Sequence, residues 1–313
     1  MELDPEFPSQ GPAQRSQVAA GDPELQRLIP TDRRNHRALL GFFNEQEVRQ
    51  FLQGKVQSAE QFDEIMGRWG VARSRICALP PFLNEPEIRP ILEPEVLLEI
   101  EKVMQLPECK QAFPEGTWSV SLVELSGIIA FQPGLDTEYA SGGGEDPLSP
   151  GDLLSAVKIS FPFGKTSTLA VSMDQAQKAI TVSGVNPSLQ VVGLTWGQQA
   201  AIGPFAITFF VSAGPNVMQV SRYRGRCFLS NGYHRAYRLM KAGFTHIPCL
   251  LRNASDFAQT GAFGAGFFPE SILMSPRPPL FIDFEDGDLG IDVPVHSAKK
   301  MVRIRPDEFL AIG

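Results

Sequence analysis

Residues 220–251 constrain the fold of this chain more than any other part of its 313 residues. Two short extended runs flank a Tyr-Arg-Gly-Arg turn, which predicts a β-hairpin. A helix is expected next, because apolar residues then recur at helical spacing before the glycine stop at Gly243. The recurring residues are Tyr233, Ala236, Tyr237 and Met240. Residues 247–251 then have the pattern of a buried strand.

The start of this helix is the best candidate for a functional site. Ser230 or Asn231 can cap the helix, Gly232 permits a tight backbone turn, and His234 and Arg235 follow in the first turn. A helix start leaves backbone N–H groups unpaired and carries partial positive charge, so it favours bound anions. The pattern predicts a phosphate site, with Arg226 and Arg238 as supporting residues. The alternative is that these residues form an ordinary solvated helix face.

The segment resembles the ParB/sulfiredoxin superfamily. The resemblance rests on the loop Gly232-Tyr233-His234-Arg235, on Gly243 and on Ile247-Pro248, and it covers roughly thirty residues. In that family the loop holds nucleotide phosphates, which implies the same role for Gly232, His234 and Arg235. Tyr233 occupies the position of the sulfiredoxin cysteine, so the sulfinic-acid chemistry lacks its nucleophile. The DNA-reading helices of the partitioning proteins are not found after Leu251.

A second candidate site is an acidic stretch near the C-terminal end. Clustered carboxylates bind hard cations such as Mg²⁺, which a nucleotide site often needs. The stretch lacks EF-hand spacing, so an acidic surface turn is the alternative reading. A Gly-Lys-Thr run at 164–166 is not a P-loop, because Ile159 stands where that motif needs glycine. The candidate metal ligands are Asp283, Glu285, Asp286 and Asp288.

The remaining patterns predict an α+β protein. Residues 1–22 are expected to be disordered or tag-like, and 23–114 to form a helical subdomain. Residues 115–313 are expected to form the ParB/sulfiredoxin-like mixed domain with a β-rich insertion and a flexible, glycine-rich loop at 134–151. Helices are expected in residues 45–52, 59–69 and 94–106. Strands are expected at 120–125, 128–131, 157–162, 169–173, 179–185, 189–194, 205–211 and 299–304.

The composition of the chain indicates which partners and which cellular compartment to expect. The net charge is −7 and the pI about 5.3, which disfavours nonspecific nucleic-acid binding. The four cysteines are far apart in sequence, and the chain shows neither a secretory signal nor an apolar run long enough to cross a bilayer. A cytoplasmic protein with reduced thiols and no membrane association is therefore expected.

These observations support three functions. The first is a nucleotide- or phosphate-binding domain that acts as a switch or a phosphoryl-transfer enzyme, with a nucleoside triphosphate and Mg²⁺ as ligands. The second is a noncatalytic protein-interaction module that retains the fold and binds a partner through its helical region and phenylalanines. The third is a DNA-associated protein. The sequence identifies no catalytic base, so enzyme status stays open.

Overall fold

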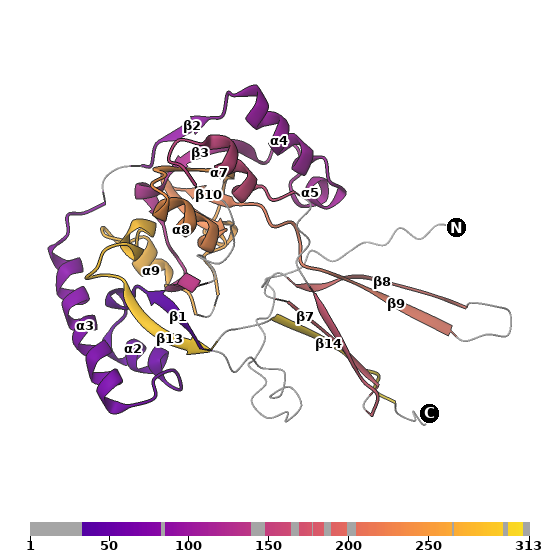
Figure 1. The fold of residues 1–313 in the computed structure, drawn as a ribbon, viewed down its shortest axis with the longest axis horizontal. Helices are drawn as coiled ribbons and strands as arrows, with labels where there is room; N and C mark the ends of the chain where they lie inside the picture. Colours follow the sequence, from indigo (N-terminus) through magenta and orange to yellow (C-terminus); the bar gives the residue numbers. More distant parts are fainter. Residues whose placement is uncertain are drawn as a thin grey trace.

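The computed structural model describes residues 33–82, 85–138, 148–163, 169–176, 178–184, 189–198, 205–264, 266–296 and 300–308. The architecture is mixed α+β, as the sequence predicts. Two small sheets project from one side of a body of helices and sheets (Figure 1). The predicted tag-like segment 1–22 and the glycine run at 142–144 lie outside the described residues.

A mixed six-stranded sheet forms the centre of the body, in the order β2-β3-β12-β10-β11-β4. Strand β10 is antiparallel to β11 and parallel to β12, which is antiparallel to β3 on its other side. The short strands β2 and β4 form the two edges. The strands are β2 (Ile88–Pro90), β3 (Ser119–Glu124), β4 (Ile128–Ile129), β10 (Gln219–Tyr223), β11 (Arg226–Asn231) and β12 (His246–Asn253).

The predicted hairpin, helix and strand are confirmed between β10 and β12. Arg224 and Gly225 take positive φ values of 48° and 75° in the turn of the hairpin, a conformation that glycine adopts at no steric cost. Helix α8 (Tyr233–Lys241) follows β11 and ends before Gly243, whose φ is 85°. The helix buries Tyr233, Ala236, Tyr237 and Leu239 against the body.

Local capping signals explain where the other helices begin. Asn44 forms a capping box with Glu47 at the start of α2, and Ser58 accepts from the Gln61 N–H at the start of α3. Pro94 occupies the first turn of α4, where its missing N–H is not needed. The helices are α2 (Glu45–Leu52), α3 (Ala59–Ala78), α4 (Pro94–Met104), α5 (Pro107–Ala112), α7 (Leu153–Ser160) and α9 (Glu270–Leu273).

The strand expected at 157–162 is wrong, because residues 153–160 form helix α7. Asp152 starts this helix by accepting hydrogen bonds from the backbone and hydroxyl of Ser155, at 3.0 and 2.6 Å. Val157 and Phe161 then pack in a core beside α4 and α5. A short apolar run fits a strand or a buried helix equally well. Here the N-cap at Asp152 favours the helix.

A three-stranded sheet joins distant parts of the chain. Strand β1 (Arg33–Ala38) pairs antiparallel with β13 (Ile291–His296) and with β5 (Gly134–Asp136). The helical region 23–114 therefore includes the strands β1 and β2, and the predicted loop 134–151 begins as β5. Its residues 139–147 lie outside the described part of the chain.

The helical region 23–114 shares its hydrophobic core with the rest of the body. Val48, Ile65 and Ala72 from α2 and α3 belong to the same buried cluster as Phe228 of β11 and Phe281. Phe281 lies in the 3₁₀ turn η4 (Phe281–Phe284); the other such turns are η1 (Leu40–Phe42), η2 (Leu125–Gly127) and η3 (Ala258–Thr260). No separate core belongs to α2 and α3 within the described residues.

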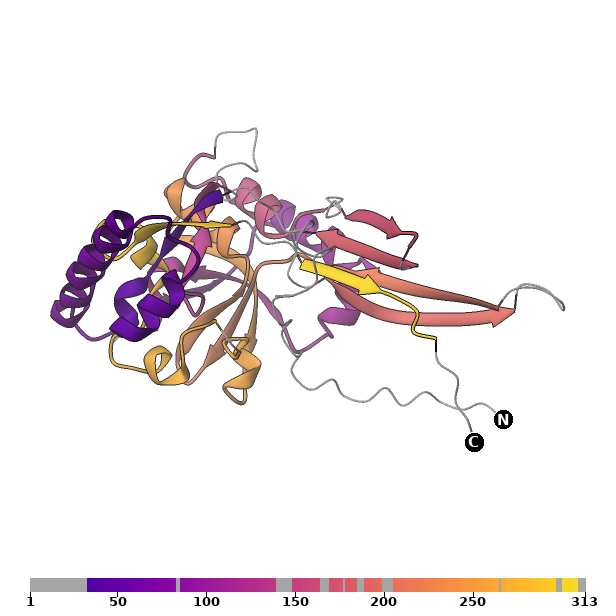
Figure 2. The same ribbon diagram turned by 90° about the horizontal axis from the view of Figure 1, so that it is seen from below.

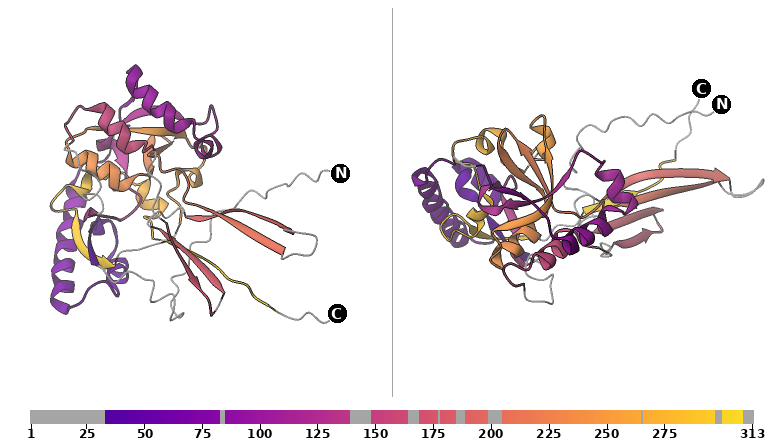
Figure 3. Two further views of the ribbon diagram at one scale, coloured as in Figure 1. Left: turned by 45° about the vertical axis from the view of Figure 1, so that its right-hand side comes forward. Right: turned by 90° about the horizontal axis from the view of Figure 1, so that it is seen from above.

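The two projecting sheets lie far from α2 and α3 (Figures 2 and 3). One sheet has the order β14-β7-β6, with β6 (Ala170–Asp174), β7 (Ala179–Gly184) and β14 (Lys300–Ile304). The other consists of β8 (Gln190–Gln198) and β9 (Phe205–Ser212), which pair antiparallel. We call this second sheet the β8–β9 arm. These strands confirm the extended segments that the sequence predicted between 169 and 211.

Candidate functional site

Gly232 begins helix α8 in a left-handed conformation. Its φ is 107°, and a Cβ at this position would lie 3.0 Å from the Cγ atom of Met218. Gly232 itself is the N-cap, and no side chain caps the helix. Asn231, expected to cap, instead donates from its side-chain amide to the carbonyl of Val217 at 3.0 Å. Asn231 therefore binds the segment that precedes β10.

Arg235 binds backbone carbonyls of two neighbouring segments. Its Nη1 atom donates to the carbonyl of Ser160, at the end of α7, at 3.0 Å. The same atom donates to the carbonyl of Asn216 at 2.6 Å. A guanidinium has five N–H donors in a rigid fork, so each bond restricts its orientation. Arg235 joins α7, α8 and the approach to β10.

His234 points from α8 towards β5. Its Nε2 atom accepts a hydrogen bond from the backbone N–H of Asp136 at 3.2 Å, which requires the neutral ring. Burial lowers the pKa of His234 to about 4, although the carboxylate of Asp136 acts in the opposite direction. His36 and Arg235 lower it further. At neutral pH this side chain is uncharged, and its Nε2 atom accepts a hydrogen bond where a phosphate site would need a donor.

Tyr233 has a structural role. The buried hydroxyl accepts from the backbone N–H groups of Phe131 and Gln132, at 2.7 and 3.1 Å. Burial raises the pKa of the phenol well above its ordinary value. The ring packs edge-on against Phe131 and Phe281. Tyr233 therefore fixes α8 to the core.

The two supporting arginines are not drawn into one anion site. Arg226 donates to the carbonyl of Leu273 at 2.8 Å, and its guanidinium lies over the ring of Phe82. Burial lowers the pKa of Arg226. Arg238 is half-buried in the second turn of α8. The structure thus brings Asn231, Gly232, His234 and Arg235 together, but their polar atoms contact protein backbone.

Three of the four candidate metal ligands, Asp283, Glu285 and Asp286, have carboxylates that bind other groups of the protein. Asp283 forms a two-point ion pair with Arg277, at 2.6 and 3.0 Å, and accepts from the N–H of Leu280. Glu285 pairs with Lys241 at 3.1 Å. Asp286 accepts from the backbone N–H groups of Asp288 and Leu289. In the described part of the chain, no three acidic, histidine or cysteine side chains form a group that could hold a metal.

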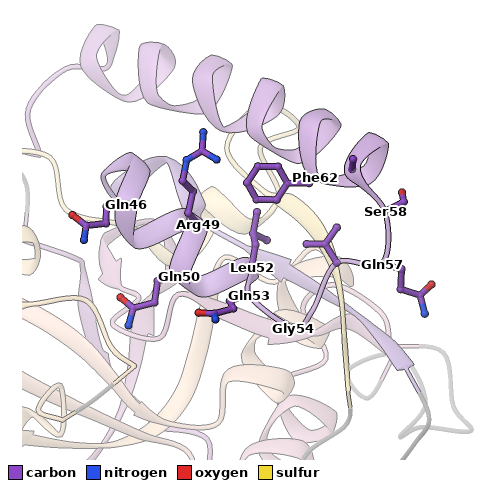
Figure 4. A pocket seen from close by; sticks show the side chains of 11 residues that line it. Gln46, Arg49, Gln50, Leu52, Gln53, Gly54, Gln57, Ser58 and Phe62 are labelled. Carbon is purple, nitrogen blue, oxygen red and sulfur yellow. The ribbon is translucent and has the colours of Figure 1, made fainter.

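A cavity of about 730 Å³ lies between α2 and α3 (Figure 4). Its lining is rich in glutamines and includes Arg49, which pairs with Glu45 at 2.7 Å, and Phe62. No residue of α8 contributes to it. The glutamines are Gln46, Gln50, Gln53 and Gln57. This polar groove is thus separate from the site expected at Gly232.

The β8–β9 arm carries an exposed apolar surface that the sequence analysis missed. Trp196 is 65% exposed and Ile207 is 57% exposed, and the two lie opposite each other in the strand register. Leu194 and Phe209 form the next such pair. One sequence signal was available, because residues 179–221 contain no charged side chain and no histidine. A soluble surface sheet usually alternates apolar with charged or polar residues.

Comparison with protein-family models, with curated proteins and with solved structures gave no match. Within the described residues, no helix has the length and apolar character needed to traverse a bilayer.

Proposed function

We propose that this chain is a noncatalytic protein-interaction module whose binding surface is the β8–β9 arm. The observation that carries the proposal is the large exposed fraction of the apolar side chains on the arm. These side chains are Val191, Val192, Leu194, Trp196, Ile207, Phe209 and Phe210. Contiguous apolar patches of this kind mark interaction surfaces in soluble proteins.

Hydrophobic burial explains why such a surface binds a partner. Each Å² of apolar surface removed from water contributes about 25 cal/mol, so covering one leucine or phenylalanine is worth about 1.5–3 kcal/mol. The open strands add a second source of affinity. In the described residues β8 and β9 pair only with each other, so their outer edges present unpaired N–H and C=O groups. A partner strand satisfies these groups by β-addition.

The proposal is tested by site-specific photocrosslinking in cells that produce the full chain. A photoreactive phenylalanine analogue at Ile207 is expected to give a covalent adduct of higher mass, because the partner covers this face. The control places the same analogue at Leu98 of α4, which is 55% exposed, against 57% for Ile207. Adducts at Ile207 and none at Leu98 support the arm as binding surface. Equal yields, or no adduct at Ile207, contradict it.

The second candidate function is phosphate or nucleotide binding by a ParB/sulfiredoxin-like domain. It is favoured by the arrangement of β10, β11, α8 and β12, with the left-handed Gly232 followed by His234 and Arg235 at the helix start. Against it stand the carbonyl bonds of Arg235 and the neutral ring of His234. The net charge of −7 likewise weighs against the DNA-associated function.

Addition of ATP, CTP or GTP with Mg²⁺ is expected to leave the melting temperature unchanged. A nucleotide bound to the native state at a hundredfold excess over its Kd stabilises by about 2.7 kcal/mol, which thermal denaturation detects easily. Arg235→Ala tests the site and Arg238→Ala is the matched control on the same helix. A nucleotide-dependent rise that Arg235→Ala abolishes and Arg238→Ala retains reinstates the nucleotide-binding function.

A further inference from the structure

The apolar side chains of the β8–β9 arm lie mainly on one face. Directly opposed residues in an antiparallel pair point to the same face, and alternate residues along a strand share it. The pairs Leu194–Phe209, Trp196–Ile207 and Val191–Val211 therefore form one continuous stripe. Gly193, Thr195, Gly197, Ala206, Thr208 and Phe210 belong to the opposite face. We call the stripe the apolar face of the arm.

We infer that the partner of the apolar face is the same face of a second copy of this chain. The inference rests on the proposed function and names the partner that the arm binds. An isologous two-fold contact uses one self-complementary patch on both subunits. A stripe of paired aliphatic and aromatic side chains meets this requirement, because apolar surface is complementary to itself without any pattern of donors or charges.

The charge distribution permits contact between the arms of two copies. Two copies of the chain each carry a net charge of −7, so their bodies repel each other. The arm lies within residues 179–221, which contain no charged side chain, and it projects away from α2 and α3 (Figure 2). Contact through the arm therefore adds no like-charge pair at the interface. The arm also offers no charge with which to select a charged partner.

The area of the apolar face suffices for a specific dimer. An aromatic side chain offers about 150–250 Å², and an aliphatic one somewhat less. Trp196 exposes 65% of its surface, Leu194 52% and Phe209 40%. Together with Val191 and Ile207, the face presents on the order of 500 Å² of apolar area. Packing two faces together removes on the order of 1,000 Å² from water, which reaches the lower limit for a specific interface.

Sedimentation of the purified full chain tests this inference. The wild-type protein is expected to convert from monomer to dimer between about 1 and 100 µM, the range of a weak and reversible contact. Leu194→Lys places one positive charge on the apolar face of each subunit, so the dimer interface would contain two. We expect it to raise the Kd at least about a hundredfold, which corresponds to about 2.8 kcal/mol. The dimer should then be lost over this concentration range.

Two lysine controls separate the face from general effects of charge. Leu98→Lys adds the same charge to α4 at a position that is 55% exposed, against 52% for Leu194. Thr195→Lys adds it to the opposite face of the arm. Both are expected to dimerise within about threefold of wild type, or about 0.7 kcal/mol. Unchanged melting temperatures show that the variants remain folded.

The outcomes distinguish this inference from the proposed function. A wild-type chain that stays monomeric at about 100 µM, or a Leu194→Lys variant that dimerises like wild type, overturns the self-association. A Thr195→Lys variant as defective as Leu194→Lys overturns the choice of face. If the Ile207 crosslink yields an adduct with a different protein, the arm remains a binding surface and only the second copy is excluded. Absence of any adduct removes both proposals.

Discussion

Replacing Arg277 by alanine is expected to lower the free energy of unfolding by about 3–5 kcal/mol. The variant leaves the carboxylate of Asp283 buried without its cation, since the Asp283 side chain is 4% exposed and that of Arg277 14% exposed. Burial already raises the pKa of Asp283, and Arg277 is the main opposing influence. Urea denaturation followed by circular dichroism measures the loss. Most point mutations cost far less.

The matched control for this prediction is Arg49→Ala. Arg49 also forms an ion pair with a carboxylate, Glu45, but both side chains are more than half exposed. Exposed pairs of this kind contribute at most about 1 kcal/mol. If Arg277→Ala and Arg49→Ala destabilise the protein equally, Asp283 does not have the structural role that we assign to it. It would then again be a candidate ligand for a bound cation.

A fall in pH from 7.5 to 5 is expected to destabilise the protein by about 2 kcal/mol through His234 alone. In the unfolded chain this side chain binds a proton near pH 6.5, whereas burial lowers its pKa to about 4 in the folded protein. Between these two values the unfolded state binds more protons, so stability falls as pH falls. The stability that depends on the neutral His234 ring is fully present above pH 6.5. It is lost progressively as the pH falls from there through about 4.

His234→Gln isolates this contribution, because an amide oxygen can also accept the Asp136 N–H but does not titrate. The variant is expected to lose about 2 kcal/mol less than wild type over the same pH interval. The remaining dependence comes from groups such as His36, whose pKa burial also lowers. Urea denaturation at both pH values measures the difference. Identical pH profiles for variant and wild type would show that His234 is solvated and not held against β5.

Local signals in the sequence predicted the elements that depend on near neighbours. The positive φ of Gly225 in the hairpin turn and the stop at Gly243 are properties of single residues. Helices α2 and α3 begin where the sequence predicted them, and the side chains of Asn44 and Ser58 accept from backbone N–H groups three residues later. Some elements with distant partners were missed. Strand β1 is an example, because its pairing with β13 leaves no trace in its own sequence.

The same distinction explains the outcome at the candidate site. The sequence placed Gly232, His234 and Arg235 together at a helix start, which the structure confirms. It could not predict that Arg235 binds carbonyls of residues 160 and 216, because that contact depends on how α7 packs beside α8. Basic side chains at a helix start therefore have two uses. They bind an anion, or they tie the helix to neighbouring loops.

The pairing of β1 with β13 affects how the chain folds during its synthesis. Arg37 of β1 donates a hydrogen bond to Asp292 of β13, which lies 255 positions later. Almost the entire body must therefore be synthesised before these two strands can pair. Contacts so distant in sequence form slowly, since the intervening polypeptide loses entropy when its ends meet. Until that moment the early helices α2 and α3 have an incomplete core, and β1 has a bare edge open to mispairing. This topology therefore makes the β1–β13 pairing a late step of folding.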